Sequence, residues 1–358
     1  MQDPSGLRPH RSFRLTGFGQ PLAEMTGQVV PPNGSAVLVA IRACGVCHSD
    51  LHIADGYFEL GAGKRLDLSK GIGLPRTLGH EIAGEVVALG PEATGVRIGD
   101  QRVVYPWIGC GGCGLCRSGQ EHLCARPATH GAAVDGGFSN FVTVPHPRYL
   151  LDFGALPATY AATLACSGLT AFSALRKAGP ISELSPLLLI GAGGVGLSAI
   201  SISRALHGTG PIVADIDPLK RQSALDAGAS EAVDPGDPET RRRLAKQTDG
   251  GFSAAIDFVG SQSSAEFGLS LLRKGGRLIA VGLFGGAIEL SLPLLPLRSI
   301  GLVGSYVGSL DEMGQLMALA RAGKFEPTKI ETHPLSQAQA TMEALRAGRV
   351  VGRAVLTP

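Results

Sequence analysis

The sequence lacks the features that mark a membrane protein, a secreted protein or a nucleic acid binder. No apolar run approaches the roughly 20 residues that span a bilayer, and the start of the chain has no apolar stretch typical of a secretory signal. Its 32 Lys and Arg residues nearly balance its 30 Asp and Glu residues, and no long basic tract is present to steer a nucleic acid. These absences predict a cytoplasmic protein without a membrane or nucleic acid partner.

Composition adds two further constraints. The seven cysteines are odd in number and clustered, and without a secretory signal this favours metal-binding thiolates over disulfides. Glycine is abundant, at 51 of 358 residues, but it is spread among apolar segments and so indicates tight turns rather than disorder. A chain of this length and hydrophobicity is expected to divide into two domains.

The pattern of apolar runs predicts an α/β protein. Over 1–157, short β-like runs are broken by glycine and proline, which indicates an irregular, mostly β domain. Over 158–296, apolar strands alternate with helix-length segments, which predicts a doubly wound parallel sheet. The tail, 297–358, is expected to return to the first domain. The charge run at 239–246 is typical of a solvated helix face.

A glycine-rich turn, GAGGVG, follows the apolar run LLLI and precedes a helical segment. Gly191 permits the tight turn, Gly193 lets the backbone approach a pyrophosphate, and Gly196 allows the helix to pack closely on the strand. Asp215 follows Gly196 by nineteen residues at the end of the next strand, where its carboxylate accepts ribose hydroxyls and repels a 2′-phosphate. The pattern predicts a dinucleotide site that prefers NAD to NADP.

Four cysteines fall within fifteen residues, inside a lobe expected over 106–126. They are Cys110, Cys113, Cys116 and Cys124. Four thiolates complete a tetrahedral shell without leaving a position for substrate, so the pattern favours a structural zinc. An iron–sulfur cluster and disulfides are the competing interpretations.

A second, more dispersed group of metal ligands is suggested by two segments. Cys47 lies in ACGVCHSDLH, and His80 and Glu81 follow in LGHEIAGEV. A thiolate, an imidazole and a third donor from a distant segment would make a zinc site with one open position, as catalytic metals require. Taken alone, each residue is also explained as ordinary packing or as a satisfied polar group.

Several motifs, in order from about Phe13 to the C-terminus, resemble the zinc-dependent alcohol dehydrogenases of the medium-chain dehydrogenase/reductase superfamily. They are ACGVCHSDLH (43–52), TLGHEIAGEV (77–86), the four-cysteine loop, LACSGLTAFSAL (164–175), LIGAGGVG (189–196) and GRAVLTP (352–358). The resemblance implies a GroES-like, mostly β catalytic domain joined to a Rossmann domain.

The resemblance also implies roles for individual residues near the metal. Cys47, His80 and Cys166 would bind a catalytic zinc, and Glu81 would lie close enough to approach it. Asp50 would fix the ring of His80, as metal-bound histidines usually require.

The proton and cofactor contacts follow from the same resemblance. Ser49 would contact the alcohol hydroxyl, and His52 would end a proton relay to solvent. His48 would lie against the cofactor phosphates, and Arg353 would reach the pyrophosphate. The other residues expected to line the cofactor are Gly194, Val195, Lys220, Val259, Gly260, Val281 and Gly282.

The implied function is NAD-dependent, reversible oxidation of a primary or secondary alcohol to an aldehyde or ketone, by hydride transfer from an alkoxide held on zinc. Two zinc ions per subunit and a homotetramer, alternatively a homodimer, are expected. The nearest alternative is a polyol- or sorbitol-type dehydrogenase. Such an enzyme normally has a carboxylate-based arrangement in place of the third zinc ligand, and Cys166 at this position disfavours the alternative. A zinc-stabilised dinucleotide-binding sensor without turnover is disfavoured by the complete ligand and relay set.

The substrate is less constrained. The segment 58–76 is longer than in the compact microbial ethanol dehydrogenases and resembles a branch of 6-hydroxyhexanoate dehydrogenases. If this loop borders the pocket, one of its cations would meet the carboxylate of a medium-chain or ω-hydroxy acid alcohol, whereas a solvated surface loop is the plainer interpretation. These cations are Lys64, Arg65, Lys70 and Arg76. The aromatic pocket candidates, each equally explained by core packing, are Trp107, Tyr57 and Phe58.

Overall fold

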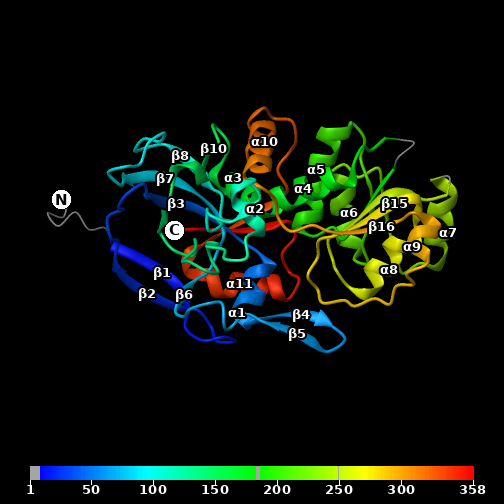
Figure 1. Cartoon of the computed structure of the whole chain (residues 1–358), viewed down its shortest axis with the longest axis horizontal. Helices are drawn as coiled ribbons and strands as arrows, with labels where there is room; N and C mark the ends of the chain where they lie inside the picture. The colour runs from blue at the N-terminus through cyan, green and yellow to red at the C-terminus, as the bar shows by residue number, and fades with distance from the viewer. Residues whose placement is uncertain (1–8, 183–185, 249) are drawn as a thin grey trace.

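The computed structural model describes residues 9–182, 186–248 and 250–358, which form two sheet-based units side by side (Figure 1). One unit is mostly antiparallel β and contains both the N-terminal strands and the C-terminal strand, and the other is a parallel sheet covered by helices. This arrangement confirms the expected α/β class. The first eight residues, on which the expectation of no secretory signal partly depends, lie outside the described part of the chain.

The antiparallel unit contains a sheet in the order β10-β8-β7-β3-β18-β17, with β9 also paired to β3, and a smaller sheet in the order β2-β1-β6. Its strands are β1 (Pro9–Leu15), β2 (Ala23–Gln28), β3 (Val37–Val46), β6 (Arg76–Thr77), β7 (Glu81–Leu89), β8 (Gln101–Val104), β9 (Phe141–Val144), β10 (Leu150–Asp152), β17 (Ile330–Pro334) and β18 (Arg353–Thr357). The helical segments around it are α1 (His48–Asp55), α2 (Gly114–Arg117), η1 (Glu121–Leu123), η2 (Pro147–Tyr149), α10 (Leu310–Arg321), η4 (Leu335–Gln337) and α11 (Ala338–Arg346).

Strand pairing in this unit brings distant segments together at one end of the sheet. Gly45 near the end of β3 pairs with Glu81 at the start of β7, and Val46 pairs with Ala354 near the start of β18. Residues that follow β3, begin β7 and begin β18 therefore meet, although they are far apart in the sequence.

The parallel sheet has the order β13-β12-β11-β14-β15-β16, the strand order of dinucleotide-binding folds. Its elements are β11 (Leu187–Ile190), α5 (Gly194–His207), β12 (Ile212–Ala214), α6 (Pro218–Asp226), β13 (Glu231–Val233), α7 (Pro238–Gln247), β14 (Phe252–Asp257), α8 (Gln262–Ser270), β15 (Leu272–Ala280), α9 (Leu294–Arg298) and β16 (Gly301–Gly304). Because β16 pairs with β15, the sheet extends past the boundary expected at residue 296. Within the tail, β17 and β18 return to the antiparallel unit.

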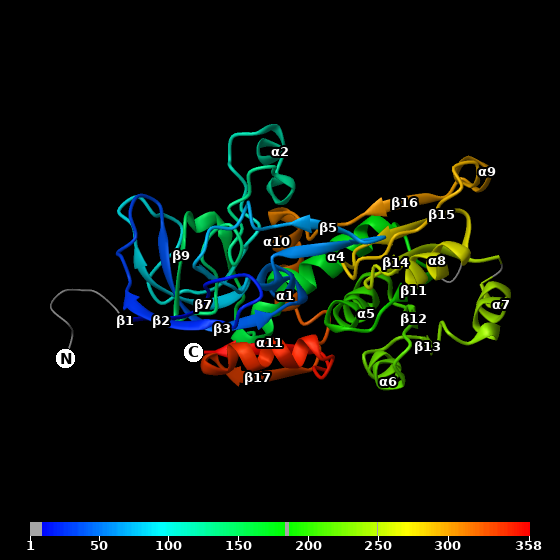
Figure 2. The same ribbon diagram turned by 90° about the horizontal axis from the view of Figure 1, so that it is seen from below.

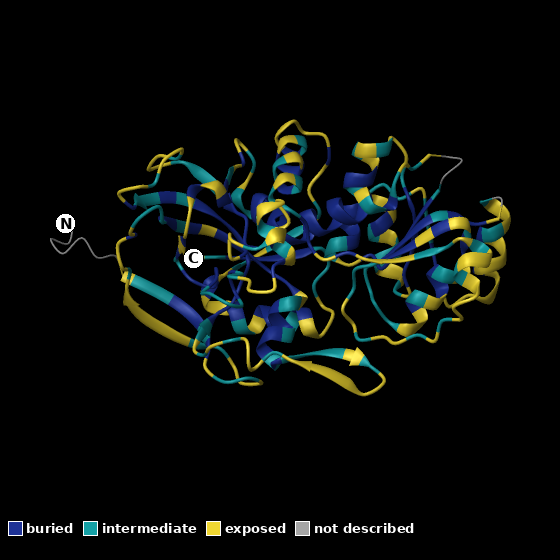
Figure 3. Cartoon of the chain, in the orientation of Figure 1, coloured by how far each residue is buried: buried dark blue, intermediate teal, exposed yellow. Residues whose placement is uncertain are grey.

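Both faces of the parallel sheet are buried. Along β11, Leu187 and Leu189 join the large core cluster shared with the antiparallel unit, and Leu188 and Ile190 join a smaller cluster on the opposite face. This explains the continuous apolar run LLLI, since a strand covered on both sides needs no polar alternation. Figure 3 shows the buried strands and central helices between exposed outer segments.

A continuous helical stretch links the two units. It consists of α3 (Ala158–Thr163), the π-helical turn η3 (Leu164–Gly168) and α4 (Leu169–Ala178). Helix α3 packs on β3 and β7, and α4 packs on α5 and β14. By length and composition alone, Ala158–Ala178 would pass as a membrane span, but 89% of its most apolar window is buried inside the protein, as in the core helix of a globular fold.

The segment expected as a loop at 58–76 contains a two-stranded hairpin instead. It is formed by β4 (Tyr57–Gly61) and β5 (Lys64–Asp67), and it extends from the end of α1 toward the parallel-sheet unit (Figure 2). The short antiparallel pairing explains the difference, because its polar alternation is too weak to be separated from a loop by sequence alone.

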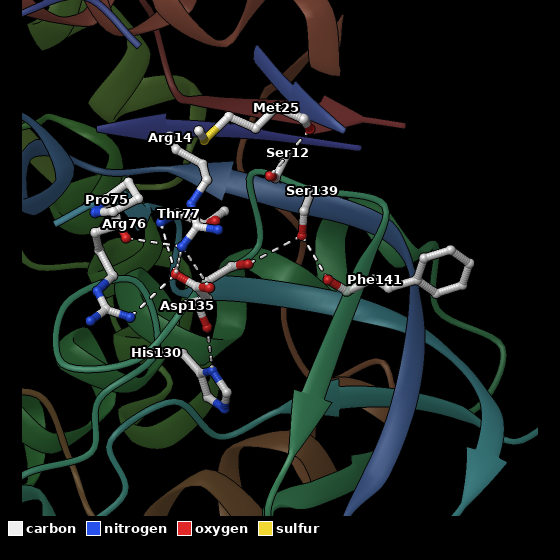
Figure 4. A network of polar contacts seen from close by, with 11 residues as sticks. Ser12, Arg14, Met25, Pro75, Arg76, Thr77, His130, Asp135, Ser139 and Phe141 are labelled. Carbon is white, nitrogen blue, oxygen red and sulfur yellow. Dashed lines mark hydrogen bonds and ion pairs between the residues drawn. The ribbon is translucent and has the colours of Figure 1, made fainter. Parts of the chain in front are cut away.

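A polar network centred on Asp135 joins β1 and β6 of the antiparallel unit (Figure 4). The carboxylate of Asp135 accepts hydrogen bonds from Arg14 at 2.9 Å, from Arg76 at 3.2 Å and from the backbone N–H of Thr77 at 3.0 Å. His130 Nδ1 donates to the Asp135 carbonyl at 2.8 Å. The network fixes the start of the segment that leads into β7.

Candidate active site

Three of the predicted metal ligands converge from separate elements. Cys47 follows β3, His80 precedes β7, and Cys166 lies in the π-helical turn η3, a kind of helix irregularity that often occurs at functional sites. One ligand atom from each of these residues, together with one from Glu81, lies within 4.8 Å of the others. The Sγ atoms of Cys47 and Cys166 are 4.0 Å apart, close to the separation of about 3.8 Å that two thiolates have on a tetrahedral zinc.

The lowered pKa of one thiol in this group favours the thiolate form, which is the form that binds zinc. The hydrogen bond with Cys166 lowers the pKa of the Cys47 thiol well below its ordinary value, against the opposing effect of burial. A zinc ligand must be a thiolate, so this pair supplies one readily.

The imidazole of His80 is oriented by Asp50. Nδ1 of His80 lies 3.3 Å from Asp50 Oδ1, and the fully buried carboxylate also accepts from the backbone N–H groups of Cys47 and Gly79 at 2.9 and 3.0 Å. Burial opposes the charged form of His80, but Asp50 outweighs it and raises the pKa of the ring well above its ordinary value. Nε2 is buried without a hydrogen-bond partner, which fits a nitrogen placed to bind a metal.

Glu81 and Arg353 form a buried ion pair beside these ligands. Glu81 Oε1 accepts a hydrogen bond from Arg353 Nη2 at 2.5 Å, and Oε2 has no partner. Burial raises the pKa of Glu81 to about 7, although the positive charge of Arg353 opposes the shift. Gly45 leaves room for the carboxylate, since a Cβ there would lie 1.9 Å from Glu81 Oε2.

The four predicted structural ligands also form one group. Cys113 Sγ lies 3.5 Å from Cys116 Sγ and 3.9 Å from Cys124 Sγ, again near the tetrahedral separation. The backbone N–H groups of Cys110 and Arg126 each donate to Cys124 Sγ at 3.3 Å. Backbone donors lower the pKa of Cys110 to about 6, whereas burial and the neighbouring Cys113 raise the pKa of Cys116 to about 11.

The glycine turn has the backbone shape expected of a dinucleotide site. Gly191 has a φ of 94°, and a Cβ at Gly196 would lie 2.0 Å from the Gly191 carbonyl oxygen. A Cβ at Gly193 would meet no other atom, so the space above the start of α5 is open for a ligand. The carboxylate of Asp215 accepts from the backbone N–H groups of Ala192 and Asp217, at 2.8 and 2.9 Å, which places it beside this turn.

The remaining predicted cofactor residues lie around the same turn. The side chain of Arg353 packs against Gly194, where a Cβ would lie 2.6 Å from Cδ. Burial lowers the pKa of His48, and the positive charges of Arg353, His52 and Lys220 add to this shift against the effect of Cys47. Val195 lies in α5, Val259 and Gly260 follow β14, and Val281 and Gly282 follow β15.

The two residues predicted for the proton relay, Ser49 and His52, lie on α1 after Cys47.

One residue near the metal ligands was not predicted. The ring of Tyr306, from the segment after β16, lies 5.8 Å from Trp107, whose ring is 5.3 Å from His80. Trp107 is held by a hydrogen bond from Nε1 to the Ala165 carbonyl at 3.0 Å. Partial desolvation and the neighbouring Cys166 raise the pKa of Tyr306, although 49% of the residue stays exposed. An aromatic residue after an edge strand is the only signal in the sequence.

Fold and site together combine two groups of side chains that could each hold a metal ion with a glycine turn of the dinucleotide-binding shape. Residues 33–153 match the family model described as "Alcohol dehydrogenase GroES-like domain", and residues 194–322 match "Zinc-binding dehydrogenase". An NAD-dependent alcohol dehydrogenase of Sulfurisphaera tokodaii is 38% identical, covering 97% of this chain and 100% of the relative. A D-arabinose 1-dehydrogenase (NADP(+)) of Saccharolobus solfataricus is 34% identical, covering 96% of each chain.

Solved structures agree with these relatives. The alcohol dehydrogenase of Aeropyrum pernix superposes with a TM-score of 0.83 at 30% identity, covering 97% of this chain and 100% of that one. The chain belongs to the zinc-dependent alcohol dehydrogenases of the medium-chain dehydrogenase/reductase superfamily, and it is an oxidoreductase that uses NAD and zinc.

Proposed function

We infer that this enzyme oxidises primary or secondary alcohols to aldehydes or ketones with NAD, and that it runs the reverse reduction with NADH. The observation that carries the inference is the convergence of Cys47, His80 and Cys166. These are three zinc ligands with a fourth position left for substrate, the arrangement of catalytic zinc sites. Arg353 links them to the glycine turn that would hold the cofactor.

Each side chain near the zinc site has a separate role in the proposed proton transfer. Zinc, when bound, lowers the pKa of an alcohol hydroxyl toward neutrality. Ser49 accepts the hydroxyl proton, and His52 passes it to solvent, because an imidazole exchanges protons near neutral pH. Asp50 keeps Nε2 of His80 directed toward the metal.

A second group of residues is proposed to bind the cofactor. Arg353 and His48 bind the pyrophosphate, and Asp215 accepts the ribose hydroxyls. Lys220 lies close to this basic group. The residues that line the rest of the cofactor are Gly191, Gly193, Gly194, Val195, Gly196, Val259, Gly260, Val281 and Gly282.

A second zinc is proposed in the four-cysteine lobe, giving two zinc ions per subunit. Its shell of thiolates leaves no position for a substrate, so its role is to stabilise a lobe that has little core of its own.

In this proposal residues 1–157 and the end of the tail form the catalytic domain, and the cofactor domain runs from 158 through β16.

Substrates with a carboxylate at the far end of a medium-length chain are proposed as preferred. Arg65 is already paired with Glu59 at 2.8 Å and Arg76 with Asp135 at 3.2 Å. Of the two other cations of this segment, Lys64 and Lys70, we propose Lys64 at the exposed hairpin tip as the partner of such a carboxylate. Replacing Lys64 with Ala is expected to raise KM for ω-hydroxy acids and to leave KM for simple alcohols unchanged.

Self-association into a homotetramer, alternatively a homodimer, is proposed through the edge strand β16. The strand ends the parallel sheet and exposes Leu302 and Val303, with Leu292 and Leu297 exposed nearby. An exposed edge strand with apolar side chains is a surface on which a second copy of the chain can pack.

A cytoplasmic location is proposed because the site depends on reduced cysteines.

The test is NADH formation by zinc-replete protein on a panel of ethanol to octanol, benzyl alcohol, 2-alkanols and 6-hydroxyhexanoate, with metal content measured in parallel. We expect two zinc ions per subunit and turnover of at least one alcohol class. His80→Gln is the control that should abolish turnover and remove one zinc. Two bound zinc ions and bound NAD without turnover of any alcohol would contradict the proposed function.

A further inference from the structure

We propose that Phe58 is a positioning residue that covers the imidazole of His52, and that the β4–β5 hairpin holds it there. The inference rests on the proposed function, because it takes His52 as the group that releases the substrate proton to solvent. Its structural basis is a direct ring contact, with the ring centroids of His52 and Phe58 4.8 Å apart and tilted by 41°.

The end of α1 directs the chain back over His52. Gly56 caps the helix with a φ of 84°, which only glycine adopts easily, and its N–H bonds to the His52 carbonyl at 2.9 Å. The Gly56 carbonyl in turn accepts from the N–H of Leu68, just beyond β5, at 2.9 Å. Both ends of the hairpin are thereby tied to the last turn of the helix that carries His52.

The hairpin is held internally as well. Arg65 pairs with Glu59 on the opposite strand at 2.8 Å, and its guanidinium lies 4.1 Å from the ring centre of Tyr57. Phe58 pairs across the strands with Leu66. These contacts of Arg65 and the pairing of β4 with β5 support the hairpin that carries Phe58.

The far end of the hairpin rests on the cofactor-binding unit. A Cβ at Gly61 would lie 2.7 Å from the backbone nitrogen of Ala287, and a Cβ at Gly285 would lie 2.5 Å from Cβ of Glu59. Backbone therefore packs on backbone just after β15, and Figures 1 and 2 show the hairpin extending from one unit toward the other. The hairpin therefore contacts both α1 and the segment after β15, and these two contacts hold Phe58 over His52.

Charged groups of both signs act on the imidazole of His52. Asp55 on the same helix and Arg346 on α11 form an ion pair at 2.7 Å, and Cys47 and His48 at the start of the helix also interact electrostatically with His52. Burial lowers the pKa of His52, and Arg346 adds to this against Asp55 and Cys47.

Phe58 supplies apolar surface and no charge, so it favours the neutral ring, which is the form that accepts a proton. Removing the phenyl ring would let water reach the imidazolium form and raise the pKa of His52.

The experiment is the pH profile of kcat for alcohol oxidation by the zinc-loaded enzyme. Because oxidation needs neutral His52, Phe58→Ala is expected to move the acidic limb of the profile upward by about half a pH unit. Phe58→Leu keeps apolar cover and should restore most of the original profile. Leu60→Ala, an exposed position on the same strand, is the matched control and should leave the profile unchanged. Should Phe58→Ala not fold, Phe58→Val is expected to give a smaller shift in the same direction.

His52→Ala separates failure of this inference from failure of the proposed relay. If His52→Ala leaves the acidic limb unchanged, His52 does not release the proton, and the relay itself is wrong. If His52→Ala removes the limb but Phe58→Ala and Phe58→Val match the native profile, the relay stands and the role of Phe58 is overturned.

Discussion

Arg353 joins the two halves of the site: its guanidinium bonds to Glu81 at 2.5 Å, and its side chain packs against Gly194 at the start of α5. Glu81 belongs to the metal-ligand group, and Gly194 belongs to the turn expected to hold the cofactor pyrophosphate. A single buried cation thus balances a carboxylate near the metal while lying within reach of an anionic cofactor.

Replacing Arg353 with Met should weaken both stability and cofactor binding. The change leaves the Glu81 carboxylate buried without its partner, which costs about 3 kcal/mol in unfolding free energy, and it should raise KM for NAD about tenfold. Urea unfolding and NAD titration measure the two effects. Adding Glu81→Gln should recover part of the stability but not the NAD affinity, and equal loss in the single and double variants would contradict the pairing.

Replacing Cys113 with Ser should remove the zinc of the four-cysteine lobe. We expect metal content to fall by one zinc per subunit and thermal stability to drop, because the lobe depends on the metal for its fold. Cys44→Ala is the control, since Cys44 is buried and lies outside both ligand groups, so it should keep both zinc ions. Unchanged zinc content in Cys113→Ser would count against the site.

Replacing Asp215 with Ser should relax the preference for NAD over NADP. The carboxylate repels a 2′-phosphate, and Arg221 and Lys220 stand nearby on α6, so the ratio of kcat/KM for NAD to that for NADP should fall at least tenfold. Asp217→Ser is the matched control. It alters the cap of α6, where Asp217 accepts from the N–H of Leu219 at 2.8 Å, and should leave the ratio unaffected.

Shortening Tyr306 to Ala should widen the space beside Trp107 and His80. We expect kcat/KM for bulky secondary alcohols to rise several-fold relative to ethanol, because the aromatic pair would no longer limit the substrate there. Tyr306→Phe keeps the ring and should retain the native selectivity. Identical selectivity across all three proteins would show that Tyr306 does not limit the substrate.

Unfolding free energy should decrease as pH falls below about 6.5, in part because of His130. Burial lowers the pKa of this ring, so the unfolded chain takes up a proton that the folded protein resists, and each such group contributes up to about 1.4 kcal/mol per pH unit. His130→Asn retains a donor for the Asp135 carbonyl and should lose less stability between pH 7 and pH 5. Parallel curves for both proteins would show that His130 is not involved.

Features encoded over short stretches were predictable from residues alone. The four cysteines lie within fifteen residues, so one loop can bring them together, and the glycine turn between an apolar strand and a helix has a local geometry that spacing reveals. The alternation of strands and helices likewise predicted the parallel sheet, because each unit forms from neighbouring residues.

Relationships across the fold needed the tertiary structure. Cys47 and Cys166 are brought together by strand pairing and an interdomain helix, and only the resemblance to a known family suggested their partnership in advance. The contact of Phe58 with His52 and the extension of the parallel sheet through β16 had no local signal. The only sequence signal for Tyr306 beside Trp107 was an aromatic residue after an edge strand.

The sequence by itself therefore determined the local ligand motifs, the cofactor turn and the class of fold, since these depend on residue spacing within single elements. The tertiary structure decided which side chains share the site and which surfaces cover it. Those contacts depend on the pairing of β3 with β7 and β18 and on how a hairpin folds back over α1, and such long-range packing leaves no periodic trace in the residues that it joins.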